Sequence, residues 1–225
     1  MSITEQTDGI WTIDHPLRVR GLIPLGTRTT IVRLLDQSLL VHSPGPLSDE
    51  HHDQIAALGT VSVIVSPNLE HVLFLSDAAS RYPNAQLWVA PGCPTALPRD
   101  ARTLDDTADA PWKGALVDFQ MAGMPRLRET VFLHEASGTL IVTDISFNIR
   151  RAGFWDRMML SMAGAYGKFG PSHLFRSYFL QDRAAFKESL DAVLAHDFER
   201  VILAHGDVVR DGGRDGLRAA FAFLG

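Results

Sequence analysis

Apolar residues gather along this chain in short runs that turn-forming residues separate. Residues 29–35 and 38–42 are two such runs with a two-residue polar link, a pattern that predicts a β-hairpin. Residues 61–65 and 86–90 are uncharged and rich in branched or aromatic side chains, which is typical of buried strands. The first half of the chain is therefore expected to contain these four strands.

Helical patterns alternate with the apolar runs. Ser48 is placed to cap a helix that continues through Ala57, and residues 70–80 predict a second helix that stops before a proline. Later in the chain, residues 182–195 carry four apolar side chains on one face, as an amphipathic helix does. Residues 214–224 predict the last helix.

The middle of the chain interrupts this alternation. Residues 94–113 are polar and rich in proline and aspartate, so we expect a loop. Residues 114–119, 128–134 and 139–143 predict a meander of strands, and residues 200–204 predict a final buried strand. The pattern favours an α/β protein with mixed sheets covered by helices. A single doubly wound sheet is the alternative, but its glycine-rich phosphate loop is missing from the sequence.

Composition narrows the class of protein. A length of 225 residues with 46% hydrophobic residues favours one globular domain over residues 1–225. The net charge of -5 argues against nucleic acid or an anionic membrane as a partner. We expect a small-molecule substrate. The single cysteine, Cys93, excludes an intrachain disulfide, and the polar residues 1–8 do not resemble a signal peptide. We therefore expect a cytoplasmic protein.

Polar residues follow four of the apolar runs directly. These positions are His42, the segment 66–71, Asp144 and His205. Ligand sites of α/β proteins gather at such strand ends, and imidazole and carboxylate groups are ligands of zinc and iron. Each residue also has an ordinary interpretation, because a histidine after a strand is often a surface or capping residue and an aspartate is often a helix N-cap.

The order of these segments resembles the metallo-β-lactamase-like hydrolase superfamily and, more narrowly, the group of unknown function called DUF4336. The resemblance rests on five stretches that occur in the right order, namely residues 28–44, 63–78, 82–92, 129–144 and 186–207. It implies an α/β fold in four layers, αββα, in which two mixed β-sheets are flanked by helices.

The signature loop of that superfamily, HxHxDH, corresponds here to residues 66–71, and its residues have largely changed. Ser66 and Asn68 stand in place of the first two histidines, and Glu70 stands in place of the aspartate. Only the last histidine of the loop, His71, is kept.

The remaining ligand positions are kept in part. Asp144 matches the bridging aspartate and His205 the final histidine, whereas the region 123–129 contains no histidine for the third position of the first metal. The resemblance thus implies one degenerate metal site formed by His71, Asp144 and His205, with Glu70 as a fourth ligand. Zinc is the expected ion, with iron or manganese as alternatives.

The implied reaction is attack by water on an ester, thioester, lactone, amide or phosphodiester bond. Glu70 is either a ligand or the general base that positions the water. His134 either donates a proton to the leaving group or supports a ligand, and Glu129 is a further candidate near the site.

Two other functions stay open. The missing histidines favour a non-catalytic, metal-free descendant of the fold that binds a small molecule or a protein. A hydrolase with a serine or cysteine nucleophile would need Ser66 or Cys93 beside a histidine base.

The methionine-rich segment 154–169 has two interpretations. In the favoured interpretation it packs in the core or at the interface of a homo-oligomer. In the other it forms a lid above the site. A lid would imply a hydrophobic acyl or aromatic substrate, whose polar head would meet Ser172, His173 and Arg176.

Overall fold

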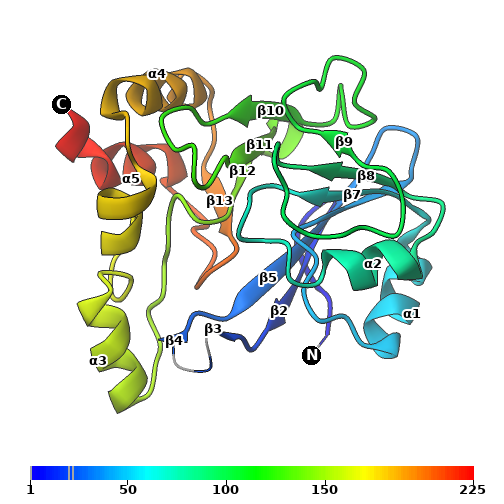
Figure 1. Cartoon of the computed structure of the whole chain (residues 1–225), viewed down its shortest axis with the longest axis horizontal. Coiled ribbons are helices and arrows are strands. Elements are labelled where there is room, and N and C mark those ends of the chain that lie inside the picture. Colours follow the sequence, from blue (N-terminus) through cyan, green and yellow to red (C-terminus); the bar gives the residue numbers. More distant parts are fainter. Residues whose placement is uncertain (1, 20, 22) are drawn as a thin grey trace. The chain divides into compact units, whose positions relative to one another are not determined.

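The computed structural model describes residues 2–19, 21 and 23–225. It divides into two compact units, each with its own sheet (Figure 1). The first unit comprises the chain up to His15 and residues Arg28–Val117, and the second comprises Pro16–Thr27 and Asp118–Gly225. The expectation of one domain over the whole chain stays a prediction.

The first unit is built on a mixed seven-stranded sheet. In spatial order its strands are β1 (Thr4–Thr7), β2 (Ile10–His15), β5 (Thr27–Arg33), β6 (Leu39–His42), β7 (Val61–Ser66), β8 (Gln86–Val89) and β9 (Arg102–Thr103). β5 and β6 form the predicted antiparallel hairpin, whereas β6, β7, β8 and β9 pair in parallel. Branched side chains from these strands and from the helices α1 (Asp49–Leu58) and α2 (Leu75–Arg81) form a common core.

The N-terminal hairpin of β1 and β2 was not predicted. Its link is Asp8-Gly9, one of the dipeptides that favour a two-residue hairpin turn, and Gly9 has a φ of 75°. This turn is therefore a signal in the sequence that could have revealed both strands.

The two helices of the first unit differ in how well the sequence predicts them. The Ser48 side chain accepts the N–H of His51 and caps α1, as predicted. The helix expected from Glu70 is wrong at its start, because α2 begins only at Leu75. The Asn68 side chain holds the main chain before α2 in a turn, which competes with a helix there.

The second unit is built on a mixed four-stranded sheet. In spatial order its strands are β10 (Val117–Gln120), β11 (Thr130–His134), β12 (Thr139–Val142) and β13 (Arg200–Leu203). β11 and β12 are antiparallel and β12 and β13 are parallel. The helical segments are η1 (Glu135–Ser137), α3 (Phe154–Met162), the π-turn η2 (Phe175–Phe179), α4 (Arg183–Leu194), α5 (Gly213–Ala220) and η3 (Ala222–Leu224), and β3 (Arg18–Val19) pairs with β4 (Ile23–Pro24).

An aromatic cluster joins the helices of the second unit. Phe186 on α4 lies 5.5 Å from Phe175 and 5.2 Å from Phe221 between ring centroids. The predicted apolar face of α4 is indeed the buried one. The last helix ends earlier than predicted, because Phe221 ends α5 and a 3-10 turn follows.

The methionine-rich segment forms α3, but it is not core. Phe154, Trp155, Met158 and Met162 are exposed, and Leu160 alone is buried within the helix. The expectation of core packing is therefore wrong for most of α3, whereas the alternative of a homo-oligomer interface stays a prediction. Among the residues that the structure describes, no helix has the length and apolar character needed to cross a bilayer.

Candidate functional site

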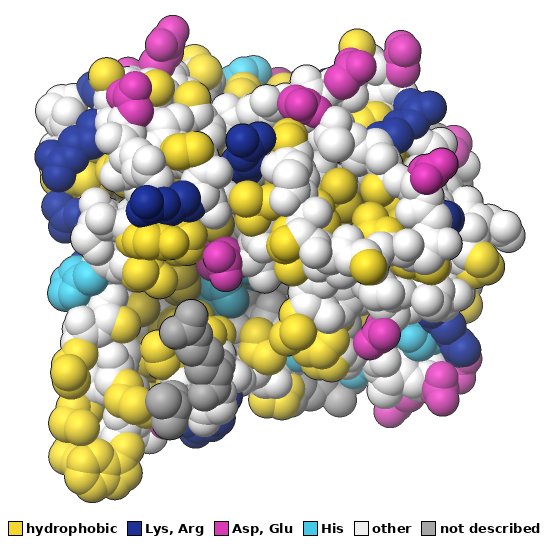
Figure 2. All heavy atoms as spheres, in the orientation of Figure 1, with side chains coloured by type: hydrophobic (Ala, Val, Ile, Leu, Met, Phe, Trp, Pro, Cys, Tyr) yellow, Lys and Arg dark blue, Asp and Glu magenta, His cyan; other side chains and the backbone are white. Residues whose placement is uncertain are grey.

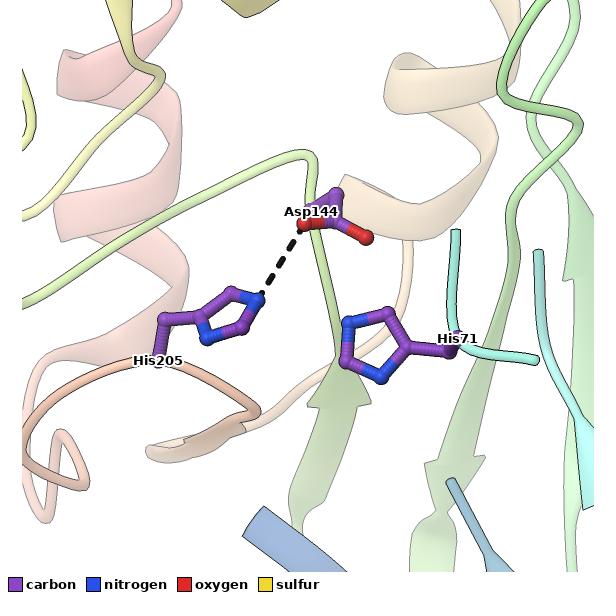
Figure 3. A group of neighbouring side chains, drawn as sticks. All are labelled: His71, Asp144 and His205. Carbon is purple, nitrogen blue, oxygen red and sulfur yellow. Dashed lines mark ion pairs between the residues drawn. The ribbon is translucent and has the colours of Figure 1, made fainter. Parts of the chain in front are cut away.

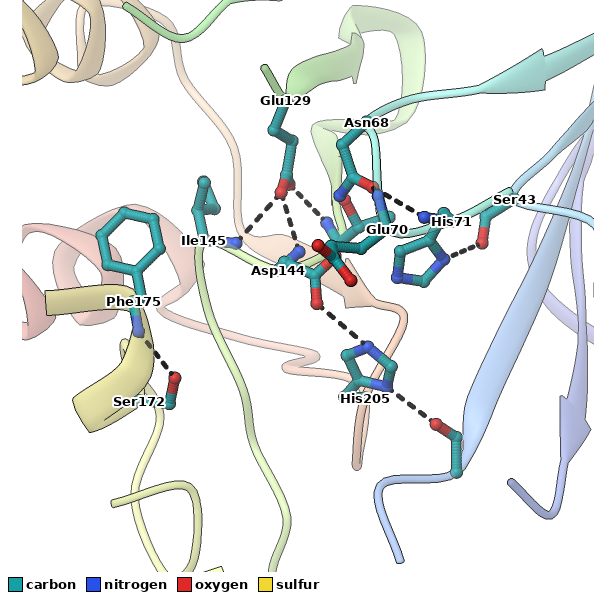
Figure 4. A network of polar contacts seen from close by, with 12 residues as sticks. Ser43, Asn68, Glu70, His71, Glu129, Asp144, Ile145, Ser172, Phe175 and His205 are labelled. Carbon is teal, nitrogen blue, oxygen red and sulfur yellow. Dashed lines mark hydrogen bonds and ion pairs between the residues drawn. The ribbon is translucent and has the colours of Figure 1, made fainter. Parts of the chain in front are cut away.

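The loop after β7 takes its shape from two buried polar side chains, of which Figure 4 shows Asn68. The Asn68 side-chain oxygen accepts the N–H groups of Glu70 and His71, each at 2.9 Å. The Ser66 hydroxyl donates to the carbonyl of His71 at 2.9 Å. Two positions that carry histidines in the superfamily motif therefore build the turn that carries His71. Since the Ser66 proton is directed to a carbonyl oxygen, Ser66 is unsuited to act as a nucleophile.

His71 has a partner that the sequence analysis did not find. Its Nδ1 lies 2.5 Å from the hydroxyl of Ser43, the residue that follows β6 (Figure 4). Ser43 is buried and has a φ of 54°, a left-handed conformation that is unfavourable for a residue with a side chain. This contact uses one nitrogen of the ring, so that Nε2 is the atom His71 offers to a ligand.

A buried histidine lies behind His71. Burial, with a smaller contribution from the neighbouring charge of His71, lowers the pKa of His42 to about 3. His42 is therefore neutral at physiological pH, and it adds no positive charge beside His71.

Asp144 and His205 lie together in the second unit. They follow β12 and β13, which are parallel neighbours with Val142 opposite Leu203, so both side chains emerge at the same end of the sheet. The Nε2 of His205 is 3.3 Å from Oδ1 of Asp144 (Figure 3). The sequence analysis predicted this meeting at the strand ends.

The tautomer of His205 follows from its other contact. Nδ1 lies 2.8 Å from the carbonyl oxygen of Gly26, which can only accept, so Nδ1 carries a proton. The ring is buried and stacks on Phe147 with an interplanar angle of 9°. A neutral ring would then direct the lone pair of Nε2 at a carboxylate oxygen, which is repulsive. Either a second proton or a cation is needed between them, so the pair fits a cation site.

Glu129 supports Asp144 from behind. Its buried carboxylate accepts the N–H groups of Thr143, Asp144 and Ile145 at 2.7, 2.8 and 3.1 Å (Figure 4). Burial and the charge of Asp144 together raise the pKa of Glu129 to about 7, against the opposing effect of the hydrogen bonds. Sequence reasoning named this residue as a candidate but gave it no position. In the structure, Glu129 holds the loop that carries Asp144.

His134 lies at the other end of the same sheet. It pairs with Thr139 at the start of β12, whereas Asp144 follows the end of that strand. The length of β12, three residue steps, corresponds to about 10 Å along a strand and separates the two residues, so His134 is remote from Asp144. Its Nδ1 bonds to Ser137 at 2.8 Å instead. We therefore leave His134 out of the proposed site.

The last two candidates lie in the first unit. The side chain of Glu70 is exposed on the loop that Asn68 shapes. Cys93 is half-buried, and it packs against the apolar core of this unit.

Comparisons with known proteins agree with the predicted fold. Solved structures that resemble the chain include a metallo-β-lactamase from Erythrobacter litoralis (16% identity, 99% of this chain and 89% of that one, TM-score 0.61). They also include the metallo-β-lactamase FIM-1 from Pseudomonas aeruginosa in its mono-zinc form (14% identity, 99% and 92%, TM-score 0.62). A third is the flavodiiron protein from Giardia intestinalis, of which this chain covers 58% (16% identity, all of this chain, TM-score 0.67).

These likenesses confirm the predicted α/β fold with its mixed sheets, which is that of the metallo-β-lactamases. No curated protein matches the sequence. Residues 7–153 match the family described as "Domain of unknown function (DUF4336)". Since this match covers well over half of the chain, the protein belongs to the DUF4336 family.

Proposed function

We propose that this protein is a metal-dependent hydrolase in which His71, Asp144 and His205 hold one divalent cation. Figure 3 draws these three side chains. The observation that carries the proposal is the pair of His205 and Asp144, whose ring nitrogen and carboxylate oxygen lie 3.3 Å apart while Nδ1 is bound to a carbonyl.

The donor atoms suit a transition metal. Two imidazoles and a carboxylate form a set that could hold a metal ion, and zinc sites commonly use such nitrogen and oxygen ligands. Metal-bound histidines usually have a hydrogen-bond partner on the other ring nitrogen. Ser43 is that partner for His71, and Gly26 is that partner for His205. Zinc is our first choice, with iron or manganese as alternatives.

A single ion fits the loop after β7 better than two. The side chains of Ser66 and Asn68 bond to the main chain of their own loop. Neither brings the imidazole that a second ion of the usual histidine-rich kind would need. The likeness to a metallo-β-lactamase in a mono-zinc form agrees with a site for one ion.

A divalent cation in this site would act as a Lewis acid and lower the pKa of water bound to it. Glu70, whose carboxylate is exposed on the loop before α2, would accept a proton from the attacking water. Glu129 would keep Asp144 in place through the three main-chain N–H groups. The scissile bond would be an ester, thioester, lactone, amide or phosphodiester of a small molecule.

Metal analysis of protein purified without an affinity tag tests the proposal. We expect one zinc, iron or manganese ion per chain, and a loss of affinity of at least about tenfold in Asp144→Asn and in His205→Gln. His134→Gln is the matched control, because this histidine belongs to the same sheet but lies at its other end. Protein that stays free of metal after loading with all three ions would overturn the proposal.

The second candidate is a metal-free binding protein of the same fold. The replacement of two motif histidines by Ser66 and Asn68 favours it. In that case the His205 ring would carry two protons and form a simple ion pair with Asp144. Nitrogen-15 NMR of the histidine side chains after loading with zinc separates the two, because only this candidate expects Nε2 of His205 to keep its proton in the presence of the metal.

A further inference from the structure

Helix α3 presents an apolar face away from the unit that it belongs to. At about 100° per residue, Phe154, Met158, Met162 and Trp155 share one arc of roughly 100°, and Leu160 lies on the opposite side. Leu160 is the buried residue of the helix, and it joins the apolar cluster that includes Phe147 and Ile149. The four side chains on the outer face are 46–75% exposed. Figure 2 shows hydrophobic side chains gathered at the lower left, where Figure 1 places α3.

The helix is held firmly enough to present this face. Its side with Leu160 packs beside β4 and the apolar cluster. At its C-terminal end the main-chain N–H of His173 donates to the carbonyl of Ala163. The Nδ1 of the His173 ring donates to the carbonyl of Met162 at 3.0 Å. The exposed face is therefore a fixed feature of the second unit.

The sequence segment that contains α3 carries a net positive charge. Residues 145–181 contain five arginines or lysines and one acid, which gives a net charge of +4 in a chain whose total is -5. Arg150 and Arg151 precede α3 and are exposed, and Arg157 lies on the helix with its guanidinium 5.9 Å from the Phe154 ring. The one acid, Asp156, is bound by Arg18 at 3.0 Å.

We propose that α3 docks on the surface of an anionic phospholipid bilayer. Tryptophan, phenylalanine and methionine side chains on a short helix favour the boundary between headgroups and acyl chains, and arginines beside them bind lipid phosphates. A second copy of the chain fits this face less well, because a two-fold contact would place the arginines of both copies together. The expectation against an anionic membrane came from the total charge, which conceals the uneven distribution of charge along the chain.

The tryptophan distribution provides a direct readout. Trp155 is 68% exposed, whereas Trp11, Trp88 and Trp112 are at most 8% exposed. Insertion of α3 into a bilayer surface should therefore shift the emission of Trp155 to shorter wavelength and leave the other three tryptophans unchanged. We expect this shift with vesicles of phosphatidylcholine containing about one-third phosphatidylglycerol, and binding at least about tenfold weaker to pure phosphatidylcholine.

Two pairs of variants test the apolar and the charged parts separately. Phe154→Ser with Met162→Ser, and Arg151→Glu with Arg157→Glu, should each weaken co-sedimentation with the anionic vesicles by at least about tenfold. Leu35→Ser with Leu73→Ser is the control for exposed apolar residues of the first unit. Arg183→Glu with Lys187→Glu, on α4, is the control for charge, because it changes the net charge by the same amount as the pair of arginine variants. Both controls should bind like the unchanged protein.

Two results would overturn the proposal. The first is the absence of both co-sedimentation and the emission shift with anionic vesicles at low salt. The second is a dimer in analytical ultracentrifugation that Phe154→Ser with Met162→Ser dissociates, since a second copy would then cover the face. Neither result bears on metal binding, so this inference stands apart from the proposed function.

Discussion

The loops that carry two of the proposed ligands, His71 and Asp144, are held in place in different ways. The loop with His71 is shaped by Asn68, whose side chain bonds to main-chain groups two and three residues later. The loop with Asp144 is held by Glu129, whose partners lie 14 to 16 residues later. A local turn keeps much of its own geometry, whereas the second loop depends on a buried charge from a neighbouring strand. The loop of Asp144 should therefore be the more sensitive of the two.

Removal of the Glu129 carboxylate should have the largest effect. Glu129→Ala leaves three buried or partly buried N–H groups without their acceptor and should lower the free energy of unfolding by about 3 kcal/mol. Urea denaturation measures the loss. Glu129→Gln keeps the size and one acceptor oxygen, so it should lose less than Glu129→Ala. A Glu129→Gln variant as stable as the unchanged protein would show that side-chain volume, and not the hydrogen bonds of the carboxylate, holds this loop.

Acid should weaken the first unit through a buried histidine. Burial lowers the pKa of His15 to about 4, so the unfolded chain binds a proton near pH 6.5 that the folded chain binds only at lower pH. The contribution of His15 to the free energy of unfolding is complete well above pH 6.5, and it is lost as the pH falls towards 4. Between pH 6.5 and 5 the loss should be about 2 kcal/mol.

The matched variant for this effect is His15→Gln, which keeps a polar side chain that can bond to Thr29. Urea denaturation at pH 7 and pH 5 should show a smaller difference in this variant than in the unchanged protein. An unchanged difference would assign the acid sensitivity to other groups.

Removal of the Asn68 side chain should have a smaller effect than removal of Glu129. Asn68→Ala removes the neutral side-chain oxygen that accepts two hydrogen bonds. It should lower the free energy of unfolding by about 1–2 kcal/mol. Asn68→Asp keeps the acceptor and should be close to the unchanged protein. A loss larger than that of Glu129→Ala, measured in the same urea titration, would reverse the comparison of the two loops.

Ser43 provides a further test of how the two loops differ, because it supports His71 from outside the loop of that residue. Ser43→Ala should reduce the affinity for zinc about tenfold with little change in stability, since the His71 ring loses its partner on Nδ1. Ser43→Gly loses the same hydroxyl but fits the left-handed main chain at this position better. Competition with a zinc chelator should therefore give equal affinities for both variants, and thermal unfolding should separate them.

The strands and their ends could be predicted because they depend on short patterns. The run at residues 61–65 became β7, and the polar residues after β12 and β13 met as expected. The start of α2 was predicted wrongly because helical periodicity continues through residues 70–74, where Asn68 already directs the main chain into a turn. The periodicity of apolar residues carries no information about the hydrogen bonds that one side chain makes with nearby main-chain N–H groups.

The supporting contacts of the site could not be predicted for a different reason. Ser43 meets His71 across 28 residues, and the acceptor for His205 is a main-chain carbonyl, which every residue has. Such partners have no signature in residue type or spacing. The exposure of α3 was missed because an apolar segment is usually buried, and the sequence does not say which way a helix faces.

The bond between His205 and Gly26 joins residues that are 179 positions apart. During translation the carbonyl of Gly26 is made long before its imidazole partner, which follows β13. The protonation state of this histidine is therefore fixed late in biosynthesis. A ribosome-bound chain that stops short of β13 would hold every other proposed ligand, yet it could not bind the ion as the finished protein would.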